Sequence, residues 1–407
     1  MSEWKTYRME DVAELCLGKM LDAKKNKGTL RPYLNNVSVR WGSFDLSDLP
    51  MMRFEDSEIE RYVARKGDIV ACEGGEPGRC AMWKSDTPIF LQKAVHRIRV
   101  KKGFDPCFVY YDFRYLVTSG KTAHLETGST IRHLPGQALK EVELAIPDLP
   151  TQRRIAAVLG ALDDKIENNR KICENLEAQA QALFKSWFVD FEPWGGKMPE
   201  EWKKGKLGDL AECNPFRRLP KGVDARCVEM ADLVTNGAFP SGWSTKKYTG
   251  GMKFRNGDTI VARITPCFEN GKAAFINFLE EDEVGFGSTE YVVISSCSAA
   301  PGGLFYSLVK SPDFITYAKS RMVGSSGRQR FNAEDVASFP LTIAPNNVYL
   351  ELAPYYESIM EKIAQCGKES RALAEMRDAL LPQLMSGRLR VDATACQGEI
   401  DVGKVEI

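Results

Sequence analysis

The chain has 407 residues, 43% hydrophobic and 27% charged, and its 55 Lys and Arg balance its 55 Asp and Glu. This is the composition of a globular protein with room for about two to four domains. No apolar run approaches the ~18 residues of a transmembrane helix, and the amino terminus lacks the apolar core of a signal peptide. The 11 cysteines include no Cys-x-x-Cys pair. They argue against zinc or disulfides and predict a cytoplasmic location.

Residues 1–149 predict a first module of mixed α/β structure. Lys66-Gly67-Asp68 is a turn signal, and the β-branched residues after it predict a strand. Residues 95–100 alternate between apolar and basic side chains, which predicts a second strand. Residues 108–119 predict a short helix.

Residues 150–189 predict one long helix. Its apolar positions alternate steps of four and three residues, the heptad pattern of a helix that packs along another helix. These seam positions are Ile155, Leu159, Leu162, Ile166, Asn169, Cys173, Leu176, Ala180, Leu183 and Trp187. Asn169 is a polar residue within the seam, and we expect it to fix the register of the pair. Charged residues such as Asp163, Asp164 and Glu177 are expected on solvated faces.

Residues 190–346 predict a second module, with a Pro- and Gly-rich linker at 190–199. Short segments of the first module recur here: Trp4 is matched by Trp202, and Gly67-Asp68 by Gly257-Asp258. Residues 289–294 predict a strand and 304–319 helical structure. Residues 24–48, however, have no counterpart in residues 216–245. A shared framework with unshared segments is what two scaffolds with different targets would show, although neutral divergence would look the same.

Residues 347–389 predict a second long helix with the spacing of the first. An offset of 197 residues separates Ile155 from Leu352 and Leu183 from Leu380. The second seam comprises Leu352, Tyr356, Ile359, Ile363, Cys366, Ser370, Leu373, Arg377, Leu380 and Leu384. Pro354 is expected to kink or delay the start of this helix. Residues 390–407 predict a polar tail.

The repeat predicts an α+β chain of two mixed modules and two long helices that pair along their seams, with internal duplication. The alternative is two unrelated amphipathic helices, each packed on its own core. The shared register of the two seams favours the pair.

Complete catalytic motifs are missing from the sequence. Gly120-Lys121-Thr122 resembles the end of a phosphate loop, but Tyr115 stands where the first glycine is required. Asn214-Pro215-Phe216 lacks the second proline of the amino-methyltransferase tetrapeptide, and we interpret it as a turn. The three histidines do not have the spacing of a metal hydrolase. The sequence therefore predicts a protein without catalytic or metal-binding residues.

Basic residues gather in the expected loops, where their side chains suit phosphates and base edges. A net charge of zero counts mildly against nucleic-acid binding but does not exclude a basic face. Gly128-Ser129-Thr130 and Gly324-Ser325-Ser326 each precede an arginine, and this recurrence is the best sign of a shared role. The candidate DNA-binding residues are Lys24, Lys25, Lys27, Arg31, Arg132, Arg217, Arg218, Lys246, Lys247, Arg328, Gln329 and Arg330.

Over nearly its whole length the chain resembles the specificity subunits of Type I restriction–modification systems. The resemblance rests on the doubled layout, on Gln152-Arg153-Arg154-Ile155-Ala156, and on the ends of the two helices. The first helix closes with Leu183-Phe184-Lys185-Ser186-Trp187-Phe188, and the second with Leu380-Leu381-Pro382-Gln383-Leu384-Met385-Ser386-Gly387.

The resemblance implies that each module is a target-recognition domain for half of a split double-stranded DNA site. It also implies that the two long helices form an antiparallel coiled coil that separates the modules, with internal pseudo-two-fold duplication. It implies docking of two methyltransferase subunits that carry S-adenosylmethionine, and of ATP- and Mg-dependent restriction subunits. This chain would supply sequence choice without catalysis or a cofactor of its own. The alternatives are a DNA methyltransferase with fused recognition domains and a coiled-coil scaffold with no DNA role. The sequence does not give the DNA target or its spacer length.

Overall fold

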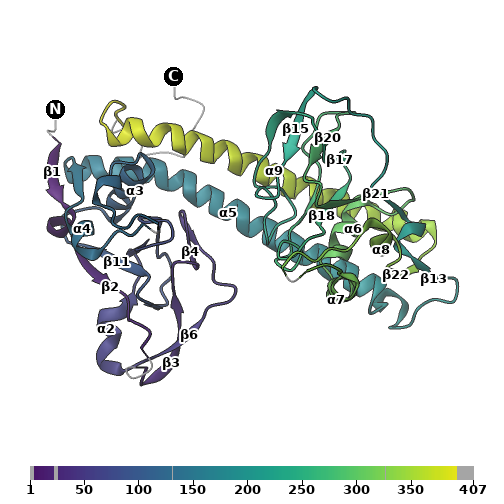
Figure 1. Cartoon of the computed structure of the whole chain (residues 1–407), viewed down its shortest axis with the longest axis horizontal. Helices are drawn as coiled ribbons and strands as arrows, with labels where there is room; N and C mark the ends of the chain where they lie inside the picture. Colours follow the sequence, from purple (N-terminus) through teal and green to yellow (C-terminus); the bar gives the residue numbers. More distant parts are fainter. Residues whose placement is uncertain (1–3, 23–25, 131, 326, 392–407) are drawn as a thin grey trace. The chain divides into compact units, whose positions relative to one another are not determined.

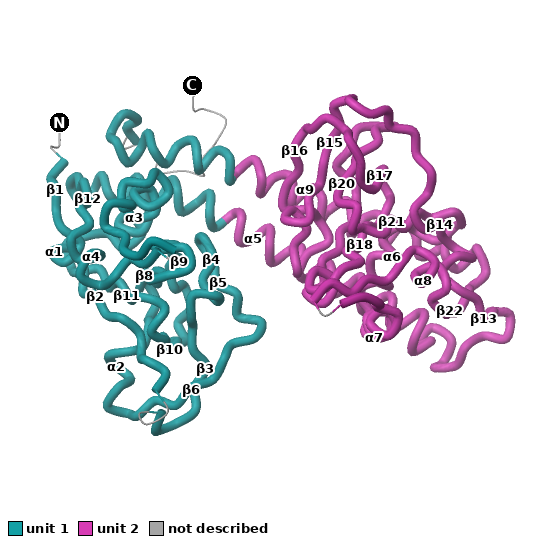
Figure 2. The backbone as a smooth tube through the Cα atoms, viewed as in Figure 1, with its two compact units in different colours: residues 1–164, 374–407 teal, residues 165–373 magenta. Residues whose placement is uncertain are grey.

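The computed structural model describes residues 4–22, 26–130, 132–325 and 327–391. The chain divides into two compact units, which we call unit 1 (residues 1–164 and 374–407) and unit 2 (residues 165–373), coloured separately in Figure 2. Two long helices, α5 (Leu149–Phe188) and α9 (Asn346–Met385), contribute turns to both units (Figure 1). The predicted class, α+β with two mixed modules and paired long helices, is confirmed.

Unit 1 contains two four-stranded sheets. In spatial order, the first comprises β2 (Ala13–Leu17), β11 (Val95–Val100), β8 (Ile69–Cys72) and β9 (Cys80–Met82). The second comprises β6 (Met51–Phe54), β3 (Thr29–Leu34), β10 (Ile89–Leu91) and β7 (Val63–Ala64). The four residues of β8 are all buried, as expected for an apolar strand covered on both faces.

Smaller elements complete unit 1. Its strand pairs are β1 (Lys5–Arg8) with β12 (Glu143–Ile146), and β4 (Val39–Arg40) with β5 (Ser43–Phe44). Its helices are α1 (Met9–Val12), α2 (Ile59–Tyr62), α3 (Pro106–Thr118) and α4 (Gly136–Lys140), with 3-10 turns at Asp56–Glu58 and Ala123–Leu125. The core of the unit joins α3 to both long helices through Phe108, Leu159 and Leu384.

Unit 2 repeats the two sheets in the same strand order. The first comprises β14 (Ala211–Cys213), β21 (Tyr291–Ser296), β18 (Thr259–Ala262) and β19 (Ala273–Phe275). The second comprises β16 (Ser244–Lys247), β15 (Asp224–Val228), β20 (Gly285–Gly287) and β17 (Met252–Phe254). The one parallel contact among these described strands recurs too, between β3 and β10 and between β15 and β20. The duplication therefore extends to strand order and direction.

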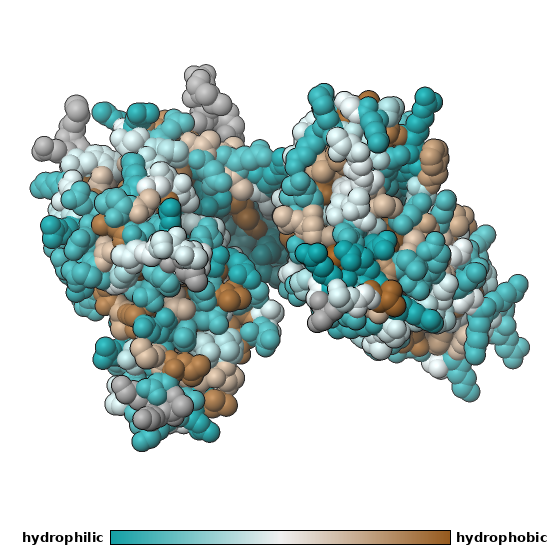
Figure 3. Space-filling view, viewed as in Figure 1, coloured by the Kyte–Doolittle hydropathy of each residue, from teal (hydrophilic) through white to brown (hydrophobic). Residues whose placement is uncertain are grey.

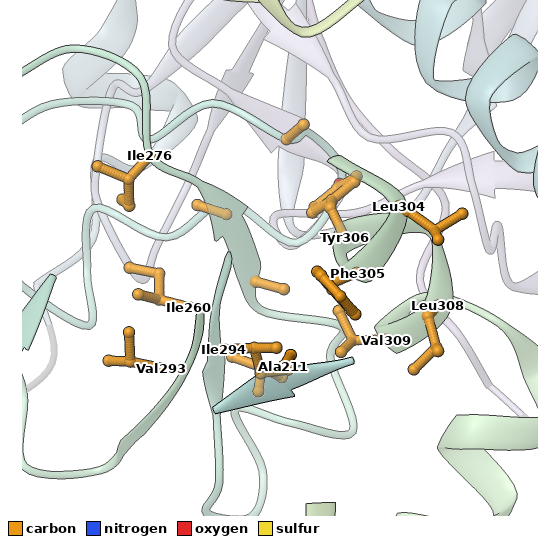
Figure 4. Close-up of a cluster of buried hydrophobic side chains, with 14 of the residues drawn as sticks. Ala211, Ile260, Ile276, Val293, Ile294, Leu304, Phe305, Tyr306, Leu308 and Val309 are labelled. Carbon is orange, nitrogen blue, oxygen red and sulfur yellow. The ribbon is translucent and has the colours of Figure 1, made fainter. Parts of the chain in front are cut away.

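Smaller elements complete unit 2. They are the pair β13 (Lys203–Lys206) and β22 (Pro340–Ile343), the helices α6 (Gly302–Val309), α7 (Pro312–Arg321) and α8 (Ala333–Ala337), and 3-10 turns at Glu192–Trp194 and Leu207–Asp209. Of these, α6 and α8 contact strands of the first sheet. Figure 4 shows Phe305 and Val309 of α6 beside Ile294 and Ala211 of the sheet. The helical structure predicted at 304–319 is two helices, because Ser311 caps α7 and Pro312 occupies its first turn.

The repeated Gly-Asp pair forms the same turn in both units. Gly67 and Gly257 each have φ of +90°, a conformation that costs glycine little. The carboxylates that follow accept a backbone N–H three residues upstream, at 2.7 Å from Arg65 to Asp68 and 2.7 Å from Arg255 to Asp258. Each motif thereby fixes the start of a central strand, β8 or β18.

The contacts of α5 with α9 in unit 2 show that the two helices run antiparallel there. Asn169 contacts Cys366, while farther along α5 the carbonyl of Ala180 accepts a hydrogen bond of 3.0 Å from Tyr356. Asn169 is 1% exposed, and its amide donates at 2.8 Å to Oε2 of Glu369. Cys366 is also its equivalent in the repeat, since the offset is 197 residues. Asn169 therefore contacts its own equivalent in the repeat, and its buried amide nitrogen has hydrogen-bond partners on α9.

All predicted seam residues are buried or half-buried in their own units. Among them are Ile155, Leu162, Ile166, Asn169, Leu176, Leu183, Leu352, Ile359, Ile363, Leu373 and Leu380. The expectation that Pro354 delays the second helix is wrong, because α9 begins at Asn346 and passes through Pro354. Pro354 is exposed.

Two acidic residues expected on solvated faces are half-buried and hydrogen-bonded instead. In unit 1, Asp163 accepts hydrogen bonds of 2.7 Å from both Tyr111 and Arg377. In unit 2, Glu177 accepts one from the backbone N–H of Ala238 at 2.7 Å and one from the hydroxyl of Tyr306 at 3.0 Å. Burial raises the pKa of Glu177. These carboxylates attach α5 to its surroundings in each unit.

Candidate nucleic-acid interface

Two hairpins hold the repeated Gly-Ser motifs. In unit 1, residues 127 and 133 exchange two backbone hydrogen bonds of 2.8 Å, and in unit 2 residues 323 and 330 exchange two of 2.9 Å. We call these turns hairpin 1 (residues 127–133) and hairpin 2 (residues 323–330). Their two ends are equivalent in the repeat within one residue, so the motifs occupy the same place in both units.

Each hairpin is attached to the chain that leaves a central strand. His133 forms a β-bridge with Gly74, two residues beyond β8, and Arg330 forms one with Ile264, two residues beyond β18. In hairpin 2, a further pair of bonds, both 3.0 Å, joins the backbone of Gln329 to the N–H and hydroxyl of Thr265. The base of each hairpin is therefore fixed beside a central strand.

The arginines of the hairpins differ in their partners. Arg132 is 65% exposed and lies 3.6 Å from the carboxylate of Glu126. Arg328 is exposed. Arg330 is bound to Glu290, with its Nε and Nη2 donating at 2.8–3.0 Å. This contact with Arg330 lowers the pKa of Glu290. Arg330 therefore supports the hairpin, while Arg132 and Arg328 present their guanidinium groups to solvent.

The other candidates of unit 1 lie around its second sheet. Lys27 is exposed just before β3, and Arg31 is exposed on β3 opposite Met52 of β6. Lys24 and Lys25 lie outside the described residues. Hydrophilic side chains cover much of the face of this unit seen in Figure 3.

The remaining candidates of unit 2 divide into paired and unpaired side chains. Arg217 is 11% exposed and donates from Nη2 to both oxygens of Asp258, at 2.6 and 2.7 Å. A role for Arg217 in contacting DNA is therefore not supported, because its charge is committed to a buried carboxylate. Lys246 and Lys247 form surface ion pairs with Glu229 and Asp224, at 2.6 and 3.2 Å. Arg218, next to Arg217, is exposed.

The buried carboxylates find their cations in different places in the two units. Asp68 is bound by Arg99 of β11, through Nε at 2.9 Å and Nη2 at 2.7 Å, whereas Asp258 is bound by Arg217 from the loop after β14. Sequence reasoning missed these pairs because the partners are far apart in the chain. The recurring Gly-Asp was the available signal, since a buried acid requires a partner. In the described part of the chain, no cluster of three or more His, Cys, Asp or Glu is arranged to hold a metal.

The fold and its hairpins define a class of protein in which one α/β module, with its long helix, occurs twice. A family model described as the Type I restriction modification DNA specificity domain matches residues 1–178. The MjaIX specificity subunit of Methanocaldococcus jannaschii is 28% identical over 365 residues, covering 82% of this chain and 80% of that protein. The HindI specificity subunit of Haemophilus influenzae is 22% identical, covering 96% of this chain and 100% of that protein.

A solved structure shows the same fold. The crystal structure of the S subunit of a Type I restriction–modification system from M. genitalium superposes with a TM-score of 0.56 at 17% identity, covering 94% of this chain and 96% of that one. The chain is therefore similar to Type I restriction enzyme specificity subunits over most of its length. Among the described residues, no helix is both long and apolar enough to cross a membrane.

Proposed function

We propose that this chain selects the DNA sequence on which a Type I restriction–modification complex acts, with each unit reading one half of a split target. The observation that carries the proposal is the recurrence of a hairpin with an exposed arginine at equivalent places in two duplicated modules. Exposed arginines suit phosphates and guanine edges. Two copies of one scaffold with unlike segments suit two different half-sites.

The partners follow from the same proposal. Two methyltransferase subunits would carry S-adenosylmethionine, and restriction subunits would carry ATP and Mg. This chain would hold no cofactor and perform no catalysis. The family names of the relatives and the incomplete Asn214-Pro215-Phe216 motif support this division of labour. A purified chain that transfers methyl groups on its own would favour the fused methyltransferase instead.

The arginines of the hairpins provide the test. The complex of this chain with its modification subunits is titrated with duplex DNA over a range of salt concentrations, first as wild type and then as Arg132→Ala and Arg328→Ala. Each lost phosphate contact should weaken binding and reduce the salt slope by about 0.9. Arg321→Ala is the matched control, since Arg321 is exposed on α7 and its guanidinium stacks on Tyr317.

Sequencing of methylated sites in cells that carry the same variants adds an independent measure. A bipartite methylated motif that depends on this chain supports the proposal. Unchanged affinity and slope for both hairpin variants would show that the hairpins do not face DNA. A wild-type complex without sequence preference would refute the function itself.

A further inference from the structure

Phe216 is an exposed aromatic residue that unit 2 holds in a defined place. It is 90% exposed, the largest exposed fraction among the large apolar side chains that the structure describes. A phenyl ring in water forgoes the burial that drives folding. A single exposed apolar side chain is common on protein surfaces, but Phe216 also lies between two anchored residues and beside a cation.

The backbone on the amino-terminal side of Phe216 is fixed by Asn214. Asn214 adopts φ of +58°, a left-handed conformation that asparagine tolerates better than most residues. Its backbone N–H donates to Val293 at 2.7 Å, and its side-chain oxygen accepts from the N–H of Val293 at 2.9 Å. Pro215 then restricts the link to the ring.

The carboxyl-terminal side of Phe216 is fixed by Arg217. Its guanidinium is bound to the buried Asp258 and donates a hydrogen bond of 3.1 Å to Ser295. Its carbonyl oxygen accepts a hydrogen bond of 2.7 Å from Nζ of Lys253. Two anchored neighbours therefore hold Phe216 outward. The Asn214-Pro215-Phe216 motif, which lacks the pattern of a catalytic loop, thus forms a turn that leaves the ring of Phe216 exposed to solvent.

The surroundings of the ring are cationic. The ammonium group of Lys253 lies 5.7 Å from the ring centroid of Phe216 and 5.4 Å from that of Tyr248. Arg218 and Lys221 follow in the chain and are exposed. An aromatic ring among cations favours a polyanion that also offers apolar surface, and duplex DNA has both.

Unit 1 has a related arrangement at the equivalent place. Lys19 follows β2 as Arg217 follows β14, is 3% exposed, and binds Glu58 at 2.5 Å. Its neighbours Met20 and Leu21 are 52% and 55% exposed. In both units a buried cation thus anchors an exposed apolar residue where the unshared segments begin, as expected of a residue that contributes to a module's own specificity.

On the basis of the proposed function, we propose that Phe216 contacts a base of the half-site read by unit 2. The apolar partner is either a thymine methyl group in the major groove or a base step that the ring partly unstacks. The neighbouring cations would hold the phosphates on either side and so position the ring. Phe216 is then a specificity residue that the search for basic side chains did not select.

The test uses the complex with its modification subunits and the duplex whose motif is found by sequencing methylated sites. Phe216→Ala should weaken binding to that duplex about 10-fold, the effect expected for one lost apolar anchor. Binding to a duplex with a scrambled unit 2 half-site should change little. Phe216→Leu should retain part of the preference. Met198→Ala is the control, because Met198 is 38% exposed in the linker of the same unit.

Two modified duplexes separate the sources of apolar surface. In the first set of duplexes, thymine is replaced by uracil at one position at a time. If the ring touches a thymine methyl group, one replacement should lower the affinity of the wild type and leave the affinity of Phe216→Ala unchanged. Fluorescence of 2-aminopurine should rise with the wild type and not with Phe216→Ala, if the ring unstacks a step. Either result supports the proposal.

Other results overturn it. Phe216→Ala that binds the target with wild-type affinity and preference shows that the ring does not touch DNA. Phe216→Ala that fails to retain the modification subunits on a sizing column shows that the ring faces protein. A wild-type complex without preference for a bipartite duplex refutes the proposed function, and this inference with it.

Discussion

Asp112 is a carboxyl group inside the core of unit 1. It lies on α3, is 2% exposed, and its Oδ2 atom has no hydrogen-bond partner among the described residues. Burial raises its pKa to about 8, although a hydrogen bond from the backbone of Ala145 opposes the shift. An unfolded aspartate has a pKa of about 3.9. Between these values the folded state binds more protons, so its stability falls as the pH rises.

We predict that Asp112→Asn stabilises unit 1 in a pH-dependent way. At pH 8 the variant should gain on the order of 1 kcal/mol or more, because the wild type must either bind a proton or bury a charge when it folds and the amide does neither, and the gain should vanish near pH 4. Hydrogen exchange of the α3 amides at both pH values measures the local stability. An equal effect at pH 4 and pH 8 would mean that Asp112 is ionised in the folded chain.

The residue scale also shows the limits of sequence reasoning. Arg217 and Arg328 are both arginines in expected loops, and the sequence gives no reason to treat them differently. The fold places Asp258 beside Arg217, 41 residues away in the chain, and leaves Arg328 exposed. The charge of a side chain therefore identifies it only as a candidate for DNA binding. Its ion-pair partner can be identified only from the folded structure.

At the scale of the long helices, a polar pair in unit 1 has apolar residues at the equivalent positions in unit 2. In unit 1 this pair is Asp163 and Arg377, with side chains 16% and 12% exposed. In unit 2 the repeat offset puts Met360 and Ala180 at the equivalent positions. In the sequence, Arg377 is a charged residue within the second seam, but its partner Asp163 was expected on a solvated face of the first helix. The apolar spacing predicted the pairing face, and it could not predict which polar residues belong to it.

We predict that Asp163→Ala costs about 3 kcal/mol of stability in unit 1, because it removes the less exposed of the two carboxylates that pair with Arg377 and leaves this half-buried guanidinium with the exposed Asp378. The double variant Asp163→Met with Arg377→Ala copies unit 2 and should recover much of that loss. Hydrogen exchange of the helix turns in unit 1 reports both. A double variant no better than the single one would show that the pair has little coupling.

At the scale of the whole molecule, the helices connect two similar modules, so their length is expected to matter for the spacing of the half-sites. Removing residues 166–172 and 363–369 deletes one heptad from each helix together with Asn169 and Cys366. Each helix loses about 10 Å, which equals about three base pairs. Sequencing of methylated sites should reveal a shorter spacer, or no methylation, with unchanged half-sites. Full methylation of the original site would show that the helices do not set the spacing.

The duplicated topology leads to a second prediction at this scale. Exchanging residues 20–140 for the matching segment of another family member should change only the half-site read by unit 1, because that segment contains most of its strands and hairpin 1. The methylated motif of the chimera is the measurement. A change in both half-sites would contradict modular recognition. The sequence predicted this modularity from short repeats, but the unshared segments left the second sheet of each unit unpredicted.

The core of unit 1 is closed by residues from α9, among them Leu381 and Leu384, which are 4% and 1% exposed. Unit 2, residues 165–373, is continuous and lies between the two parts of unit 1. During synthesis, unit 2 is therefore complete before unit 1 receives its last apolar side chains. A ribosome that stops shortly after residue 373 would release a chain with one finished unit and one open core. The last turns of α9 are therefore needed to complete the core of unit 1, although they are synthesised after the whole of unit 2.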